Sequence, residues 1–248
     1  MKLLKQLKKR CKNTVEIFLD TASVKEIEKF LPWGIISGVT TNQKIFLQEK
    51  GVNFKDRARE ILSLVDGPVS LELTKISASD DELIEEAKEY SSWNPKNVAI
   101  KVPMFKDGRG LRIINRLSRE KIKTNATCMV TTNQVLLAAK AGATYTSIFY
   151  NRVKDWGGDP FKVVQDSRAI IEKGGLKSRI IVGSIRRPTD VPEATVAGAH
   201  IITIPPKILV QMPWHWKTEE TIKEFDRAWQ EFKKAEKGTP HLDLEVQK

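Results

Sequence analysis

The stretch NPKNVAIKVPMF, residues 94–105, places a lysine in the middle of an apolar run. Side chains alternate between two faces along a β-strand, so the valines and Ile100 share one face while Ala99 and Lys101 share the other. A charged ammonium in an apolar setting is unstable unless it is paired or loses its proton. We therefore expect a strand whose aliphatic face meets helices and whose Lys101 points toward a barrel axis.

The rest of the chain repeats this strand in alternation with helices. Further runs of strand character lie at 15–20, 33–42, 67–74, 122–130, 143–152, 178–186 and 199–206. Amphipathic helical patterns lie at 24–31, 54–65, 80–90, 108–120, 133–142 and 160–175, and a long one at 218–238. A chain of 248 residues is long enough for one barrel or for two smaller domains. Eight strands without a composition break or a glycine-rich nucleotide loop predict a single α/β domain, a (β/α)8 TIM barrel.

The two ends of the chain differ from the barrel. Residues 2–12 alternate basic residues with leucines at helical spacing, which predicts an extra basic amphipathic helix. A packed appendage or a subunit contact is favoured there over a membrane-surface anchor. We expect a basic extension at 1–14, the barrel with its C-terminal helix at 15–236, and a polar tail at 237–248.

Composition limits the possible partners. The net charge of +11 favours an anionic partner, which is nucleic acid, acidic lipid or a phosphorylated metabolite. No RNA-binding motif and no membrane-spanning run is present, so neither nucleic acid nor a membrane is expected. The only cysteines, Cys11 and Cys128, lack disulfide or zinc spacing. We therefore expect a cytoplasmic protein without a metal.

Polar residues close many of the strands at the end where barrel enzymes carry their active sites. A single such residue is usually a cap or a turn residue. A whole set predicts one polar ring, and it comprises Asp20, Asn42, Glu72, Lys101, Asn125, Thr127 and Ser147.

The chemistry that this ring suits depends on Lys101. A neutral amine attacks a ketone to form a Schiff base, a carboxylate moves protons, and amides and hydroxyls hold the substrate oxygens. The alternative is a salt-bridged structural lysine. Arg152 and Arg186 follow the sixth and seventh strands near Ser184, where guanidinium groups suit a phosphate.

Motifs on all eight strands resemble those of the small-subunit transaldolases and the related fructose-6-phosphate aldolases. The resemblance extends from Ile17 to Trp229 and rests on FLDTASVKEIEKFLPWGIISGVTTNQ, VSLELT, NVAIKVPM, IKTNATCMV, QVLLAAKAGATYTSIFYNR, VGSIRRP and ITIPPKILVQM. It implies a cofactor-free enzyme whose Lys101 forms a Schiff base with a ketose phosphate and passes a dihydroxyacetone unit to an aldose phosphate. It also implies a homo-oligomer, a pentamer or decamer, with the C-terminal helix packed on a neighbour.

The same resemblance implies a role for each site residue. Asp20 is expected to be the acid and base at the C4 hydroxyl, and Glu72 with Thr127 to hold the catalytic water. The dihydroxyacetone hydroxyls are assigned to Asn42, Asn125 and Ser147, and the phosphate to Arg152, Ser184 and Arg186.

Two positions separate the branches of that family. The aldolases typically have glutamine where this chain has Glu72 and tyrosine where it has Phe149. Phenylalanine cannot donate the proton that releases free dihydroxyacetone, so transfer is favoured over cleavage alone. Departures from the family pattern at Gln43, Tyr150 and Asn151, where proline, a small or aliphatic residue and glycine are usual, leave an aldolase or an enzyme for a modified sugar open. An inactive barrel or a nucleic-acid-binding protein is the third alternative.

Overall fold

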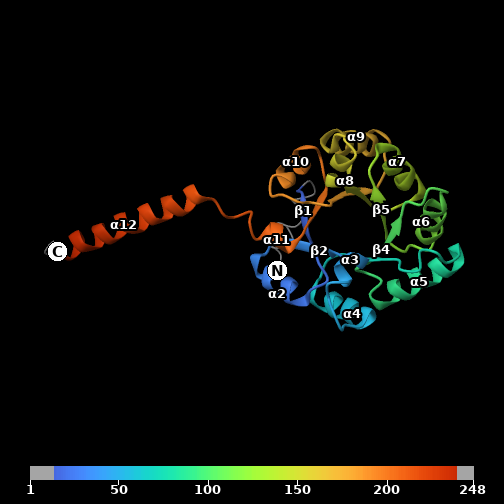
Figure 1. The fold of residues 1–248 in the computed structure, drawn as a ribbon, viewed down its shortest axis with the longest axis horizontal. Coiled ribbons are helices and arrows are strands. Elements are labelled where there is room, and N and C mark those ends of the chain that lie inside the picture. The colour runs from blue at the N-terminus through green and yellow to red at the C-terminus, as the bar shows by residue number, and fades with distance from the viewer. Residues whose placement is uncertain (1–13, 239–248) are drawn as a thin grey trace, which may run out of the picture. The chain divides into compact units, whose positions relative to one another are not determined.

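A computed structural model describes residues 14–238 and shows a closed parallel barrel (Figure 1). Its strands follow one another in sequence order, and β1 pairs with both β2 and β8. The strands are β1 (Glu16–Asp20), β2 (Ile36–Thr40), β3 (Val69–Glu72), β4 (Val98–Pro103), β5 (Thr124–Met129), β6 (Tyr145–Phe149), β7 (Arg179–Gly183) and β8 (Ile201–Ile204). The predicted (β/α)8 fold is confirmed, with one strand in each predicted run.

Helices form a ring outside the strands (Figure 1). They are α2 (Val24–Phe30), α3 (Gln43–Phe46), α4 (Phe54–Leu64), α5 (Asp80–Trp93), α6 (Arg109–Arg119), α7 (Thr132–Ala141), α8 (Tyr150–Asp155), α9 (Pro160–Lys173), α10 (Asp190–Val196) and α11 (Pro206–Leu209), with a 3-10 turn η1 (Leu31–Trp33) after α2. None of the helices in residues 14–238 has the length and apolar character of a membrane span. The same residues contain no cluster of three or more His, Cys, Asp or Glu side chains placed to hold a metal ion.

Local sequence signals explain where the longer helices begin. Ser79 and Thr131 form capping boxes with Glu82 and Gln134, which satisfies free N–H groups at the start of α5 and α7. The sequence did not predict α3 and α8, because helices of four and six residues are too short to show a periodic pattern. This is why 143–152 reads as one strand, whereas β6 ends at Phe149 and α8 begins at once.

The barrel axis is filled by apolar side chains from several strands. Phe18, Ala99, Tyr145, Ile181 and Ile201 form one buried cluster. Ala99 shares the inward face of β4 with Lys101, as the alternation of side chains predicts, and the aliphatic residues of β4 are fully buried on the other face. The filled axis below the polar ring therefore leaves solvent access only from the carboxyl end of the strands.

Residues from Val210 onward form a second compact unit, which we describe by itself. It contains α12 (Trp216–Gly238), which confirms the predicted C-terminal helix. The large apolar residues of α12 are more than half exposed, and they are Trp216, Ile222, Phe225, Trp229 and Phe232. The predicted basic helix at the N-terminus lies in 1–13 and the end of the predicted tail in 239–248, outside the described residues.

Candidate active site

Lys101 lies near the carboxyl end of β4 with only 4% of its surface exposed. Its Nζ donates to the carbonyl of Thr41 at 2.8 Å and lies 3.0 Å from Oε2 of Glu72. Glu72 is its register partner on β3, and both side chains are buried. Lys101 is thus salt-bridged, as the structural alternative expects, but it also faces an open cavity, which a purely structural lysine does not need.

A cavity of about 540 Å³ opens above Lys101, the size of a small-molecule site. Eight of the residues predicted from the sequence line it: Asp20, Asn42, Glu72, Lys101, Ser147, Phe149, Arg152 and Ser184. The three other predicted residues, Asn125, Thr127 and Arg186, do not. Gln43, which the sequence analysis noted only as a departure from the family pattern, also lines the cavity. Sequence reasoning missed the remaining lining residues, which are Thr40, Lys44, Cys128, Val130, Gly183 and Thr203.

Asp20 is held at the end of β1 by a chain of hydroxyls. Thr40 donates to its Oδ1 at 2.7 Å, and Thr40 in turn is hydrogen-bonded to Thr203 on β8. Burial raises the pKa of the Asp20 carboxyl, the charge of Lys101 and the Thr40 hydrogen bond oppose this rise, and the charge of Glu72 adds to it. A buried carboxyl with a raised pKa, on which the charge of Lys101 acts, suits proton transfer.

Asn125 supports the site from beneath. Its Nδ2 donates to Oγ of Ser70 at 3.1 Å, and its Oδ1 accepts from Oγ of Ser147 at 2.7 Å. Asn125 is also the register partner of Lys101 on β5 and is fully buried. It therefore fixes the Ser147 hydroxyl at the cavity wall.

A local irregularity of β5 decides which of its residues reach the cavity. The pairing of β5 with β6 shifts between Ala126 and Met129, and Cys128 has a left-handed φ of 62°. This turn brings Cys128 into the cavity wall, although strict alternation would point it at the helices. The hydroxyl of Thr127 is buried and has no hydrogen-bond partner among the described residues.

The predicted phosphate residues lie after β6 and β7. Arg152 on α8 lines the cavity, whereas Arg186 is half exposed and donates two hydrogen bonds to Asp155, at 2.7 and 2.6 Å. Arg152 lies 3.8 Å from the same carboxylate. The hydrogen bonds from Arg186 hold the pKa of Asp155 below its usual range. Ser184, whose position in the sequence lies between the two arginines, also lines the cavity.

Asp190 anchors the segment after β7 from inside the protein. Its side chain has no exposed surface, and one oxygen accepts from the backbone N–H groups of Arg186 and Arg187, both at 3.0 Å. The other oxygen lies 3.2 Å from Nζ of Lys154. Burial alone raises the pKa of Asp190, but these donors together with Asn151 outweigh it and lower that pKa to about 2.

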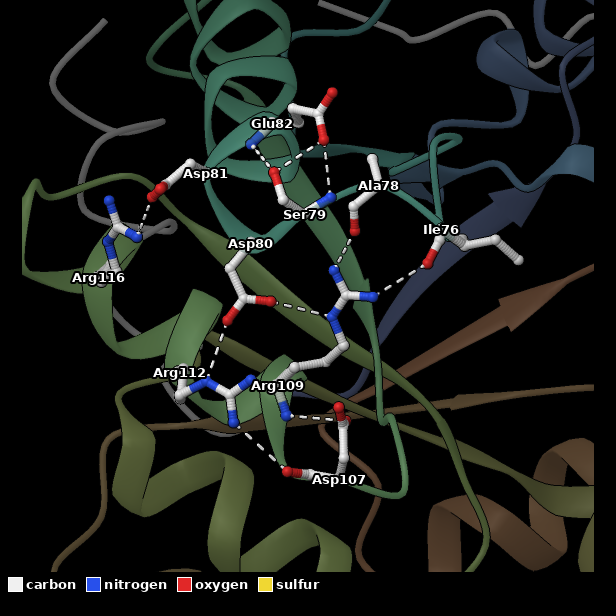
Figure 2. Close-up of polar contacts among 10 residues, drawn as sticks. All are labelled: Ile76, Ala78, Ser79, Asp80, Asp81, Glu82, Asp107, Arg109, Arg112 and Arg116. Carbon is white, nitrogen blue, oxygen red and sulfur yellow. Dashed lines mark hydrogen bonds and ion pairs between the residues drawn. The ribbon is translucent and has the colours of Figure 1, made fainter.

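Arginines on α6 tie together the loops that follow β3 and β4 (Figure 2). Arg109 and Arg112 each donate at 3.0 Å to one oxygen of Asp80, and Arg109 also donates to the carbonyl of Ala78. Arg112 reaches the carbonyl of Asp107 at 3.4 Å. These loops leave the strands that carry the buried ion pair, so the network fixes the rim above it.

Comparison with known proteins identifies the family of the chain. Residues 17–245 match the family described as Transaldolase/Fructose-6-phosphate aldolase. The chain belongs to this family. The resemblance seen in the sequence motifs is thereby confirmed for almost the whole chain.

This member of the transaldolase family matches individual relatives over all or nearly all of their length. A probable transaldolase of Carboxydothermus hydrogenoformans is 44% identical over 89% of this chain and 100% of that protein. A probable transaldolase of Symbiobacterium thermophilum is 41% identical over 87% of this chain and 97% of that protein. A probable transaldolase of Clostridium botulinum is 42% identical over 88% of this chain and 100% of that protein.

The solved structures show likeness of fold alone. A mandelate oxidase variant aligns with a TM-score of 0.54 at 11% identity, covering 77% of this chain and 64% of that chain. At this identity the match supports the barrel architecture and says nothing about the reaction.

We predict that Asp190→Asn removes a pH-dependent part of the stability. The pKa of Asp190 is lower in the folded chain than in the unfolded one, so its ionised form stabilises the fold above about pH 4, and this contribution is lost as the pH falls toward 2. The shift corresponds to about 2 kcal/mol. Denaturant unfolding at several pH values measures it: the wild-type advantage over Asp190→Asn should shrink between pH 4 and 2. An advantage that stays constant across this range contradicts the prediction.

Proposed function

We propose that the protein is a transaldolase that carries a dihydroxyacetone unit from a ketose phosphate to an aldose phosphate through a Schiff base on Lys101. The observation that carries the proposal is the Lys101–Glu72 pair at 3.0 Å, facing a cavity that Asp20 also lines. An amine, a carboxylate beside it and a second carboxyl with a raised pKa are the groups that this reaction needs.

The first half of the reaction forms and uses the imine. Glu72 takes a proton from Nζ, the neutral amine adds to the ketone carbon, and loss of water gives the iminium. Asp20 then accepts the proton of the C4 hydroxyl while the C3–C4 bond breaks. Its electron pair moves into the iminium, which leaves an enamine and releases an aldose phosphate. The buried, unpartnered hydroxyl of Thr127 supports its proposed role, with Glu72, in holding the water that is lost and regained.

The second half reverses these steps on another aldehyde. The enamine carbon attacks the acceptor, Asp20 returns its proton to the new hydroxyl, and water hydrolyses the imine. Asn42, Asn125 and Ser147 are proposed to hold the retained dihydroxyacetone hydroxyls, for which Asn125, outside the cavity lining, has to exchange its bond to Ser147. Phe149 lines the wall without a proton to give. Arg152, Ser184 and Arg186 are proposed for the phosphate, for which Arg186 has to exchange its bond to Asp155. No resident cofactor is needed in this scheme.

We also propose a cytoplasmic location, where phosphorylated sugars are processed and where two cysteines without disulfide spacing remain reduced. The basic excess of the chain then serves anionic substrates rather than nucleic acid or membrane.

The test of the mechanism is borohydride trapping with fructose 6-phosphate, followed by mass spectrometry of the digested protein. We predict a reduced three-carbon adduct on Lys101. Lys101→Met should lower turnover by more than about 10³-fold and abolish the adduct, because the nucleophile is gone while most of the side-chain volume remains. Lys123→Met is the matched control, since Lys123 lies in an exposed contact with the Lys96 carbonyl. Retained turnover in Lys101→Met rejects the mechanism.

The choice between transfer and cleavage is tested at Phe149. We predict that Phe149→Tyr raises the release of free dihydroxyacetone at the expense of transfer, because a phenol in the cavity wall can protonate the enamine. The ratio of free dihydroxyacetone to transfer product, measured with and without an acceptor aldose phosphate, reports the change. A wild type that already releases mainly dihydroxyacetone identifies an aldolase instead.

A homo-oligomer is proposed from the exposed apolar side chains of α12, and the family resemblance implies that it is a pentamer or decamer. Ile222, Phe225, Trp229 and Phe232 repeat at intervals of three and four residues, the spacing of a helix–helix seam, and all are more than half exposed. We predict that Trp229→Glu dissociates the assembly, since each buried apolar side chain contributes about 2 kcal/mol. Sedimentation measures the mass. Gln230→Glu adds the same charge at the next position and should leave it unchanged; equal masses for both variants and the wild type contradict the role of this seam.

A further inference from the structure

Ser184 is held in a backbone conformation that its own residue type disfavours. It follows β7 directly, lines the cavity, and has a left-handed φ of 59°. Residues other than glycine rarely adopt this conformation unless neighbouring groups fix it. The groups that fix Ser184 therefore control how the segment after β7 faces the cavity.

Asn151 and Asp190 supply those groups. Nδ2 of Asn151 donates one hydrogen bond to the carbonyl of Ser184 at 2.8 Å and another to Oδ2 of Asp190 at 2.7 Å. The same oxygen of Asp190 accepts from the N–H groups of Arg186 and Arg187. Asn151 is 5% exposed, and Asp190 is fully buried. The carbonyl at the start of the segment and two N–H groups further along are thus captured by one buried pair.

The capture has a chemical consequence for an anion in the cavity. The N–H groups of Arg186 and Arg187 are used by Asp190, so an anion meets Ser184 and the Arg152 guanidinium instead. Asn151 lies on α8 next to Arg152, and so one helix carries both an anion-binding side chain and the amide that orients the opposite segment. The two hydrogen bonds use both N–H groups of the Asn151 amide. Glycine or alanine at this position has no side-chain donor and cannot form either bond.

We propose that Asn151, acting with Asp190, is a positioning residue that fixes Ser184 and the segment 184–189 and thereby sets the affinity of the site for the phosphorylated end of the sugar. This inference rests on the proposed function for the identity of the substrate. The binding of an anion at this subsite is independent of the proposed function, since inorganic phosphate tests the same subsite.

The experiment compares Asn151→Ala with the wild type in two assays. We expect KM for fructose 6-phosphate to rise about tenfold, the scale of one lost hydrogen bond, while kcat changes less than about twofold. Inorganic phosphate, titrated by calorimetry, should bind more weakly by the same factor. Borohydride trapping with dihydroxyacetone, which has no phosphate, should give an unchanged adduct on Lys101.

Two further variants make the result specific. Asn115→Ala removes an amide that reaches the carbonyl of Ala141 at 3.4 Å, away from the cavity, and should leave all three readouts unchanged. Asn151→Ser keeps one donor and should give an intermediate phosphate affinity, which also serves if Asn151→Ala does not fold.

The outcomes separate the two proposals. Unchanged phosphate affinity in a folded Asn151 variant, or a wild type that binds no phosphate, overturns the positioning role. Equal losses of phosphate binding and dihydroxyacetone trapping also overturn it, because they show general damage to the site. A wild type that binds phosphate but gives no adduct rejects the Schiff-base function, and the calorimetric comparison still decides the role of Asn151.

Discussion

The burial of one ammonium group is the constraint on which the rest of the site depends. Lys101 is almost entirely removed from water, and such a charge remains stable only when its partners are close and correctly placed. Glu72 provides the opposite charge, and the carbonyl of Thr41 provides an acceptor. This fixes the register of β3 against β4 and brings the segment after β2 over the barrel. Much of the carboxyl end of the barrel is thus arranged around a single side chain.

The polar groups around the cavity fall into two kinds. Those of the first kind satisfy each other, as Ser70, Asn125 and Ser147 do across three strands. Those of the second kind face the cavity without being tied into such a chain, and they include the guanidinium of Arg152. The first kind keeps the wall rigid so that the second kind is already oriented when substrate arrives, which is the condition for electrostatic preorganisation.

The sequence predicted the barrel and eight of the fifteen residues that line the cavity, largely because strand periodicity places them. Alternation along β4 placed Lys101 inward, and the ends of the strands placed Asp20, Glu72 and Ser147 at one edge. Part of what it missed depends on local backbone geometry. The left-handed turn at Cys128 changes which residue of β5 faces the cavity, and no composition signal precedes it. The capture of the segment after β7 by Asn151 and Asp190 joins residues far apart in the chain, which no short motif reveals.

The hydrogen bond between Thr40 and Thr203 has a consequence for how the protein is made. It joins residues from β2 and β8 and helps to hold Asp20 on β1, so the first and last strands of the barrel share one polar cluster. Contacts between such distant parts of a chain form late and slow folding, because a long loop must close first. Because Thr203 lies on β8, the chain of hydroxyls that ends at Asp20 is complete only after the last strand has paired with the first. A chain that lacks β8 therefore carries Asp20 and Lys101 without the complete polar cluster that surrounds Asp20 in the closed barrel.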